Sequence, residues 1–94
     1  MKQIMIRGAS GVGKSIYVER LENAALKAGY TVAISDHELF TSLKTFEKDL
    51  KKTLANHSRA GVDISIVVIN NGERNLQITY EKGLSYELAR FLIS

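Results

Sequence analysis

One octapeptide near the start of the chain limits the possible folds more than any other feature. Residues 8–15 read Gly-Ala-Ser-Gly-Val-Gly-Lys-Ser and match the pattern G-x-x-x-x-G-K-[ST]. Lys2–Arg7, directly before the octet, reads as a strand, and Ile16–Ala28, directly after it, reads as a helix. The octet is therefore predicted to be a glycine-rich loop that joins the carboxyl end of a strand to the N-terminus of a helix.

A loop of this kind has the chemistry to bind phosphate. Gly8, Gly11 and Gly13 leave the backbone free to wrap its N–H groups around an anion, and the helix N-terminus adds a favourable dipole. Lys14 would reach the terminal phosphates, and the Ser15 hydroxyl would ligate Mg²⁺. The alternative is a turn that only caps a helix, but it does not explain why Lys and Ser follow the third glycine. The residues expected to hold phosphate are Gly8, Ala9, Ser10, Gly11, Val12, Gly13, Lys14 and Ser15.

The octet and its flanking segments resemble the P-loop NTPase superfamily. The resemblance covers about the first third of the chain, and the remainder shows only a compatible order of elements. It implies a parallel α/β sheet, binding of ATP or GTP with Mg²⁺, and phosphoryl transfer or hydrolysis of the nucleotide. Lys14 would then serve catalysis as well as binding.

The length of the chain, 94 residues, predicts a single domain over residues 1–94. P-loop domains usually carry more strands than the three or four for which this chain has room. The chain is thus either a reduced version of that fold or one that completes its sheet by self-association. A homodimer, or a complex with a protein partner, is the expected assembly.

Composition narrows the setting in which such a chain works. The sequence contains no cysteine, which excludes a disulfide framework or a thiolate metal site and fits a reducing cytoplasm. No apolar stretch approaches a membrane span, and the first strand leads straight into the loop without a signal-peptide pattern. The net charge of +3 suits an anionic ligand but is too small to indicate nucleic acid.

The segments after the loop alternate between helix and strand patterns. The first helix carries an apolar stripe and stops at Gly29, and Thr31–Ser35 reads as a short buried strand. A second helix is expected next, capped either by Ser35 and Glu38 as a Ser-x-x-Glu box or by Asp36. The stripe of the first helix is Tyr17, Leu21, Ala24 and Ala28, and that of the second is Leu39, Leu43, Phe46, Leu50 and Leu54.

The second half of the chain adds the strongest strand pattern. Asp63–Ile69 is apolar and β-branched, as in a central strand. Residues 76–80 alternate like a half-exposed edge strand, reached either by a hairpin at Asn71-Gly72 or by a wider loop. A short amphipathic helix follows, with Leu84, Leu88, Phe91 and Leu92 on its apolar face.

The order of elements is β-α-β-α-β-(β)-α. It predicts a small three-layer α/β/α fold with a mostly parallel sheet of three to four strands, a truncated P-loop-like architecture. Ligands are expected at the carboxyl edge of the sheet. The resemblance also implies that the third strand lies beside the first.

One feature departs from the pattern of the family. P-loop enzymes usually carry an acidic residue at the end of the strand beside the loop strand, where it holds Mg²⁺. Here that strand ends in Asn70-Asn71, and an amide contributes no negative charge to a metal site. Glu73 is an exposed turn residue on the simplest interpretation, and would replace the missing acid only if the turn folds back.

Asp36 follows the second strand at the expected ligand edge. A carboxylate there would orient an acceptor hydroxyl or a water for attack on the γ-phosphate, or contact the metal. The alternative is that Asp36 only caps the second helix, and the two roles are compatible. His37 is interpreted as a surface residue of the first helical turn, and His57 as a partner of the helix C-terminal dipole.

Other charged residues add little to the candidate site. Arg59, Arg74 and Arg90 are the available cations for a transferring phosphate, and no lid-like arginine cluster is present. Arg74 would lie nearest the active edge and Arg59 at the opposite rim, while Arg7 should point along its strand. The exposed side of the second helix carries Lys44, Lys48, Lys51 and Lys52, interpreted as a solvated face rather than a nucleic-acid surface.

Three hypotheses of function remain open at this point. The first is a minimal kinase-like phosphotransferase or NTPase that uses Mg-ATP or Mg-GTP, Lys14 and Asp36. The second is a non-catalytic nucleotide- or phosphate-binding regulatory module that docks on a partner protein. No base-reading motif is present, so ATP is favoured only as the commonest P-loop ligand. Nucleic-acid binding through the lysines of the second helix is a third and weaker hypothesis.

Overall fold

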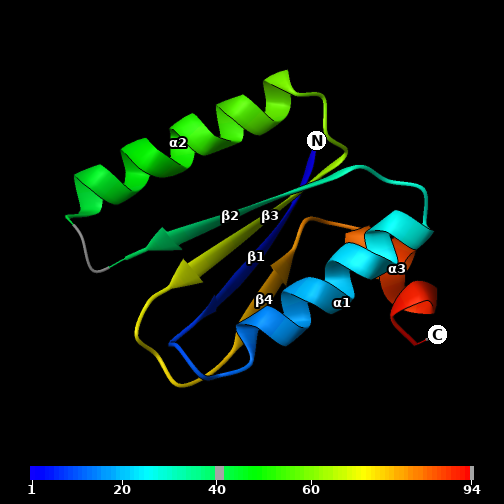
Figure 1. Ribbon diagram of the computed structural model, residues 1–94, viewed down its shortest axis with the longest axis horizontal. Coiled ribbons are helices and arrows are strands. Elements are labelled where there is room, and N and C mark those ends of the chain that lie inside the picture. The colour runs from blue at the N-terminus through cyan, green and yellow to red at the C-terminus, as the bar shows by residue number, and fades with distance from the viewer. Residues whose placement is uncertain (40–41, 94) are drawn as a thin grey trace.

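A computed structural model of the chain describes residues 1–39 and 42–93. Within these ranges the structure has three helices and one four-stranded sheet (Figure 1). In chain order the elements are β1 (Lys2–Gly8), α1 (Lys14–Lys27), β2 (Val32–Glu38), α2 (Leu43–Arg59), β3 (Ile64–Asn70), β4 (Gln77–Tyr80) and α3 (Leu84–Ile93).

The sheet is mixed, with strand order β2-β3-β1-β4. β3 pairs in parallel with β1 on one side and with β2 on the other, so the first and third strands are neighbours as expected. Every residue from Ile64 to Ile69 is buried, because an apolar β-branched strand satisfies both faces of a central position. The expectation of a mostly parallel sheet is therefore confirmed.

β4 is the exception to the parallel pattern. It pairs antiparallel with β1 and not with β3, so a hairpin at Asn71-Gly72 is wrong and the wider loop is correct. The alternation expected of an edge strand is confirmed, since Ile78 and Tyr80 are half-buried while Gln77 and Thr79 are exposed. β1 is thereby an interior strand, with the octet at its carboxyl end.

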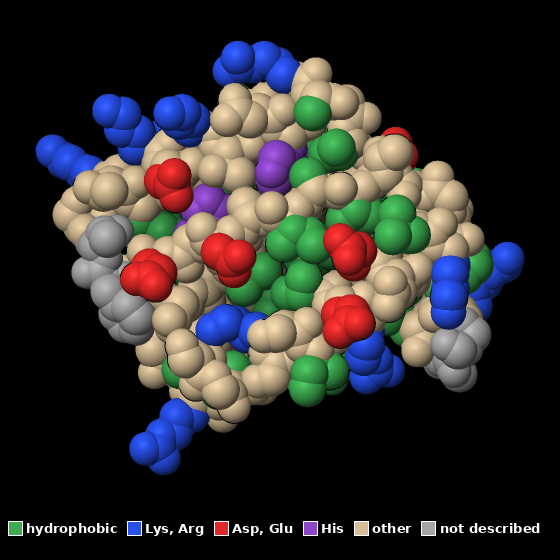
Figure 2. Space-filling view, viewed as in Figure 1, with side chains coloured by type: hydrophobic (Ala, Val, Ile, Leu, Met, Phe, Trp, Pro, Cys, Tyr) green, Lys and Arg blue, Asp and Glu red, His purple; other side chains and the backbone are tan. Residues whose placement is uncertain are grey.

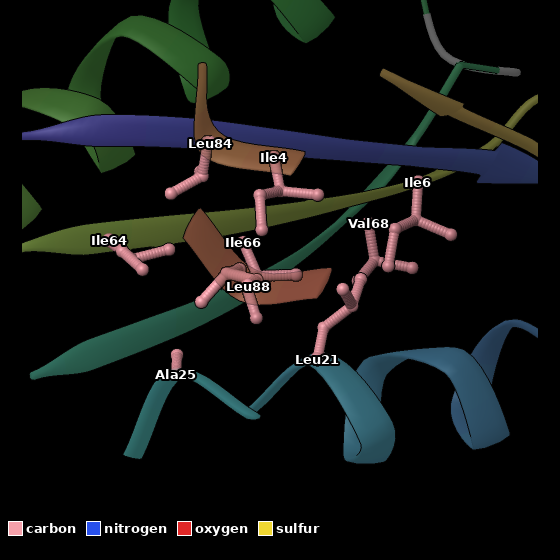
Figure 3. Close-up of a cluster of buried hydrophobic side chains, with 9 residues drawn as sticks. All are labelled: Ile4, Ile6, Leu21, Ala25, Ile64, Ile66, Val68, Leu84 and Leu88. Carbon is pink, nitrogen blue, oxygen red and sulfur yellow. The ribbon is translucent and has the colours of Figure 1, made fainter. Parts of the chain in front are cut away.

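Helices cover both faces of the sheet (Figure 1). α1 and α3 pack on one face, where the core consists of nine buried side chains (Figure 3). The strands supply Ile4, Ile6, Ile64, Ile66 and Val68, and the two helices supply Leu21, Ala25, Leu84 and Leu88. One member of the expected stripe of α1 is wrong: Tyr17 is 38% exposed, and Val18 packs against the core in its place.

The boundary between β2 and α2 corrects the expected second helix. β2 continues through Asp36 and pairs with β3 as far as Glu38, and Leu39 N–H still donates to the carbonyl of Asn70. Neither Ser35 nor Asp36 caps a helix, and Leu39 is not on α2. Part of the expected helix, residues 40 and 41, lies outside the described residues. The cap is Ser42, whose hydroxyl accepts a hydrogen bond from the N–H of Thr45 at 3.3 Å.

α2 lies on the other face of the sheet and contributes no buried residue of its own. Polar contacts attach it, beside half-buried apolar side chains such as Phe46 and Leu50. His37 Nδ1 lies 2.7 Å from a carboxylate oxygen of Asp49 on α2, and His37 Nε2 lies 2.9 Å from Ser35 Oγ. His57, in the last turn of α2, hydrogen-bonds through Nδ1 to the buried Ser65 hydroxyl at 2.7 Å. The interpretation of His37 as a surface residue is therefore wrong, since it is 5% exposed on β2.

Candidate functional site

The octet forms the connection between β1 and α1. Gly11 and Gly13 have φ angles of 84° and 94°, in the left-handed region that other residues rarely adopt. Gly8 is required for a different reason, because a Cβ there would lie 2.6 Å from Cγ2 of Val12. The two glycines of the pattern, Gly8 and Gly13, and the additional Gly11 are therefore each required by the backbone geometry of this tight loop.

The loop presents unpaired backbone donors around the start of α1. Within the described part of the chain, no backbone carbonyl accepts a hydrogen bond from the N–H groups of residues 10–16. The N-cap of α1 is Gly13, and no side chain in residues 1–39 and 42–93 caps the helix. Ala9 differs from its neighbours, since its N–H donates to the carbonyl of Glu73 at 2.7 Å and ties the loop to the β3–β4 connection. Free N–H groups at a helix N-terminus attract an anion.

Lys14 holds its amine at this same loop. Its Nζ donates to the carbonyl of Gly8 at 2.6 Å and to that of Ala9 at 2.9 Å. The side chain thus folds back over the carboxyl end of β1. A positive charge and a set of free N–H groups consequently lie around one short stretch of backbone.

A pocket of about 300 Å³ opens next to the loop, between α1 and β2. Asp36, from β2, shares it with Lys14 and Ser15, so the structure brings these three expected residues together. Figure 2 shows apolar side chains in the middle of the face in view, with Asp or Glu side chains on either side and a Lys or Arg side chain close by. The full lining is Lys14, Ser15, Val18, Glu19, Glu22, Ile34, Asp36 and Val68.

The sequence pattern does not predict two of the acidic residues that line this pocket. Glu19 and Glu22 lie one turn apart on α1 and face the pocket, although the pattern indicated only that they lie off the apolar stripe. The spacing i, i+3 does signal a common helix face. The sequence gives no sign that this face looks toward Asp36, because that depends on where β2 lies in the sheet.

The position of the missing acid is occupied by an amide that has another partner. Asn70 is in register with Gly8 at the end of β3, and its Oδ1 accepts a hydrogen bond from the N–H of Gly72 at 3.3 Å. Glu73 lines a different hollow, on the α2 side of the sheet, and does not line the pocket beside Lys14. Among the residues that the structure describes, no group of three His, Cys, Asp or Glu side chains is arranged to hold a metal ion.

The arginines stand apart from the pocket. Arg74 is exposed in the β3–β4 connection, which also contacts the loop, while Arg59 ends α2 at the opposite edge. Arg7 lies back along its own strand and donates to the sulfur of Met5 at 3.4 Å. Arg90 lies over the ring of Phe91 on α3, 5.0 Å from its centroid. The four lysines of α2 are all exposed, and cations stand out along the α2 edge in Figure 2.

A second hollow lies on the face that α2 only partly covers. It has a volume of about 570 Å³, and its apolar lining comes from both the sheet and α2. Arg7, Glu47 and Glu73 stand at the same hollow. The apolar members are Met5, Leu39, Phe46, Leu50 and Ile69.

Charged contacts tie the chain together at the edge away from the loop. Lys2 on β1 pairs with Glu87 on α3 at 2.6 Å, and the Tyr30 hydroxyl donates to the same carboxylate at 2.9 Å. These hydrogen bonds, that of Lys2 first, lower the pKa of Glu87 below its ordinary value of 4.5. The backbone N–H and the hydroxyl of Thr31 likewise lower the pKa of Asp63.

Comparisons with protein-family models, with curated proteins and with solved structures find no match to this chain. No helix within residues 1–39 and 42–93 is long and apolar enough to cross a membrane. The functional argument therefore rests on the loop, the pocket and the residues that line them.

Proposed function

We propose that the chain is a P-loop nucleotide-binding protein that takes the phosphates of ATP or GTP into the octet, together with Mg²⁺. The observation that carries this proposal is the set of unpaired N–H groups over residues 10–16, with the amine of Lys14 beside them. A triphosphate would accept hydrogen bonds from those groups, and Lys14 would exchange its two carbonyl partners for phosphate oxygens. The order of strands, with β3 parallel to and beside β1, supports the resemblance stated above.

The residues present fit a magnesium ion held mainly by its nucleotide. Mg²⁺ keeps several waters and is commonly bound through phosphate oxygens plus one or two protein groups. Ser15, in the first turn of α1, would supply a hydroxyl, and Asp36 lines the same pocket. No closed cage of three acidic or histidine ligands exists in the described residues, and such an ion does not need one.

In an enzyme of this kind, catalysis would rest on Asp36 and Lys14. Bound Mg²⁺ would supply charge neutralisation at the phosphates. The Asp36 carboxylate is exposed, has no hydrogen-bond partner among the described residues and faces the pocket beside Lys14. It would orient an acceptor hydroxyl or a water and take its proton, as in a minimal kinase-like phosphotransferase or NTPase.

The alternative function is a non-catalytic nucleotide- or phosphate-binding module that acts on a protein partner. The specific observation that favours it is Asn70, because its amide oxygen already accepts a hydrogen bond from the N–H of Gly72 and an amide brings no negative charge to a metal site. A protein of this kind would bind nucleotide and turn none over.

The binding proposal is tested by thermal unfolding with ATP, GTP and polyphosphate, with and without Mg²⁺. A ligand at about 100 times its Kd stabilises the folded state by about 2.7 kcal/mol. In a domain of this size we expect Tm to rise by on the order of 10 °C. Lys14→Ala should lose most of the rise, whereas Lys51→Ala, an exposed lysine on α2, should keep it. An unchanged Tm with every ligand would refute nucleotide binding.

Turnover separates the two functions. Release of phosphate from ATP or GTP that depends on Mg²⁺ and on Lys14 favours the enzyme. A rise in Tm without any release, in protein of defined oligomeric state, favours the regulatory module.

A further inference from the structure

The pocket between α1 and β2 has two chemically different parts. Its floor is apolar, formed by Val18 of α1, Ile34 of β2 and Val68 of β3. Its rim is acidic, with Glu19 and Glu22 on the α1 wall and Asp36 on the β2 wall. At about 300 Å³ the pocket is at the small end of the range for ligand sites.

The three rim carboxylates are unpaired among the described residues, although Lys14 lines the same pocket. In the described structure none of them takes part in an ion pair or a side-chain hydrogen bond, and the Lys2–Glu87 ion pair and the His37–Asp49 hydrogen bond lie elsewhere. The lining carries three carboxylates against one cation, the amine of Lys14, and that amine donates to the carbonyls of Gly8 and Ala9. A concave site with an excess of one sign of charge concentrates ions of the opposite sign. The acidic rim of the pocket therefore favours a cationic ligand.

The arrangement does not suit a bare metal ion. No set of three acidic or histidine side chains in residues 1–39 and 42–93 converges closely enough to hold one. Carboxylates spread around an apolar floor fit instead a molecule that has a hydrocarbon body and a separate charged group, because the body is then removed from water while the charge stays at the rim.

We propose that this pocket binds a small organic amine that carries a hydroxyl group, and that this amino alcohol is the acceptor of the phosphoryl group. This rests on the nucleotide-binding function proposed above. Glu19 and Glu22 bind the ammonium group, the apolar floor holds the hydrocarbon body, and the hydroxyl lies toward Asp36 and Lys14. Asp36 and Lys14 are the two lining residues that the proposed function places in catalysis. The acceptor therefore binds with its hydroxyl toward the loop.

Transfer of the γ-phosphoryl group to this acceptor needs no reactant other than the nucleotide and the amino alcohol. The acceptor oxygen forms a bond to the γ-phosphorus while the bond from that phosphorus to its bridging oxygen breaks. The nucleoside diphosphate leaves with the electron pair. The hydroxyl proton passes to the Asp36 carboxylate. The amine is not altered by the reaction and serves only in recognition.

Charge recognition is tested with two probes of the same shape, 2-phenylethylamine and 2-phenylethanol, in NMR titrations of the nucleotide-free protein. We expect the amine to bind more tightly, with shifts centred on α1 and β2. Each rim carboxylate at a partly exposed site contributes about a 2- to 5-fold gain in affinity. The double variant Glu19→Gln, Glu22→Gln should therefore weaken the amine by about 4- to 25-fold and leave the alcohol unchanged. Glu81→Gln, directly after β4 and outside the lining of this pocket, is the matched control.

The alcohol also reports whether the pocket is intact in each variant. Equal binding of the two probes, amine affinity that survives the double substitution, or shifts centred away from α1 and β2 would each overturn the proposal. Lys14→Ala distinguishes failure of the nucleotide-binding proposal from failure of the amine-binding proposal. This variant should lose the response to nucleotide and retain the response to the amine. If nucleotide binds and the amine does not, this inference fails alone. If the amine binds and no nucleotide does, the proposed function fails and the site is an amine pocket without transfer.

Discussion

At the scale of single residues, Asp36 provides the sharpest test of catalysis. Because it lies within β2 and Ser42 caps α2, removing its charge should cost little stability, within about 0.5 kcal/mol for a surface change. Asp36→Asn should lower turnover of nucleotide by about 10²-fold or more, as for the loss of a general base, and leave nucleotide affinity nearly unchanged. Phosphate release and thermal shift measure the two quantities. Equal turnover in both proteins would remove Asp36 from the catalytic mechanism.

The residues of the loop and those of the pocket differ in how far the sequence predicts them. Gly8, Gly11 and Gly13 could be predicted because their requirement is local, a close approach or a left-handed φ within a few residues. Glu19 and Glu22 could not be assigned to a site. Their common helix face is visible in the spacing, but its position opposite Asp36 follows from the packing of α1 against the sheet.

At the scale of elements, the start of α2 yields a stability prediction. The Ser42 hydroxyl accepts from the N–H of Thr45 and satisfies one of the free donors of the helix N-terminus. Ser42→Ala should cost about 1 kcal/mol, which lowers Tm by about 4–8 °C in a domain of this size. Ser42→Asp, which also caps, should retain the stability of the parent. Thermal unfolding measures both, and an unaffected Tm in Ser42→Ala would contradict the role of this cap.

The error at the start of α2 has an identifiable physical cause. The Ser35-x-x-Glu38 spacing satisfies the local rule for a capping box, but the same residues alternate between the two faces of a strand. In the fold, His37 forms hydrogen bonds with Asp49 and Ser35 on the face of the sheet that α2 covers. Asp36 faces the pocket on the opposite side of the sheet. Pairing of seven β2 residues with β3 stabilises this segment as a strand more than a local cap would stabilise it as a helix. β3 itself was predicted well, because an unbroken β-branched run has few alternatives.

At the scale of the whole molecule, the hollow between α2 and the sheet bears on assembly. The sequence predicts a homodimer or a complex with a protein partner. This hollow of about 570 Å³, lined by apolar and polar side chains, is compatible with either assembly. We expect light scattering to show a mass above that of the monomer as concentration rises from micromolar to millimolar. Phe46→Glu, which places a charge in the hollow, should shift that equilibrium toward the monomer. A stable monomer at all concentrations would rule out self-association and leave the partner complex.

The contacts at the edge away from the loop predict how stability depends on pH. Glu87 joins α3 to β1 through Lys2 and to the α1–β2 connection through Tyr30. Because its pKa is lower in the folded protein than the ordinary 4.5, its contribution to the free energy of unfolding is complete above that pH. The contribution is then lost as the pH falls below 4.5 and through the lower folded value.

Urea unfolding between about pH 5 and pH 3 should therefore show a steeper loss of stability in the parent than in Glu87→Gln. Added salt at about 1 M should narrow the difference, since it screens an exposed ion pair. Parallel pH profiles in the two proteins would show that this carboxylate does not link the three elements.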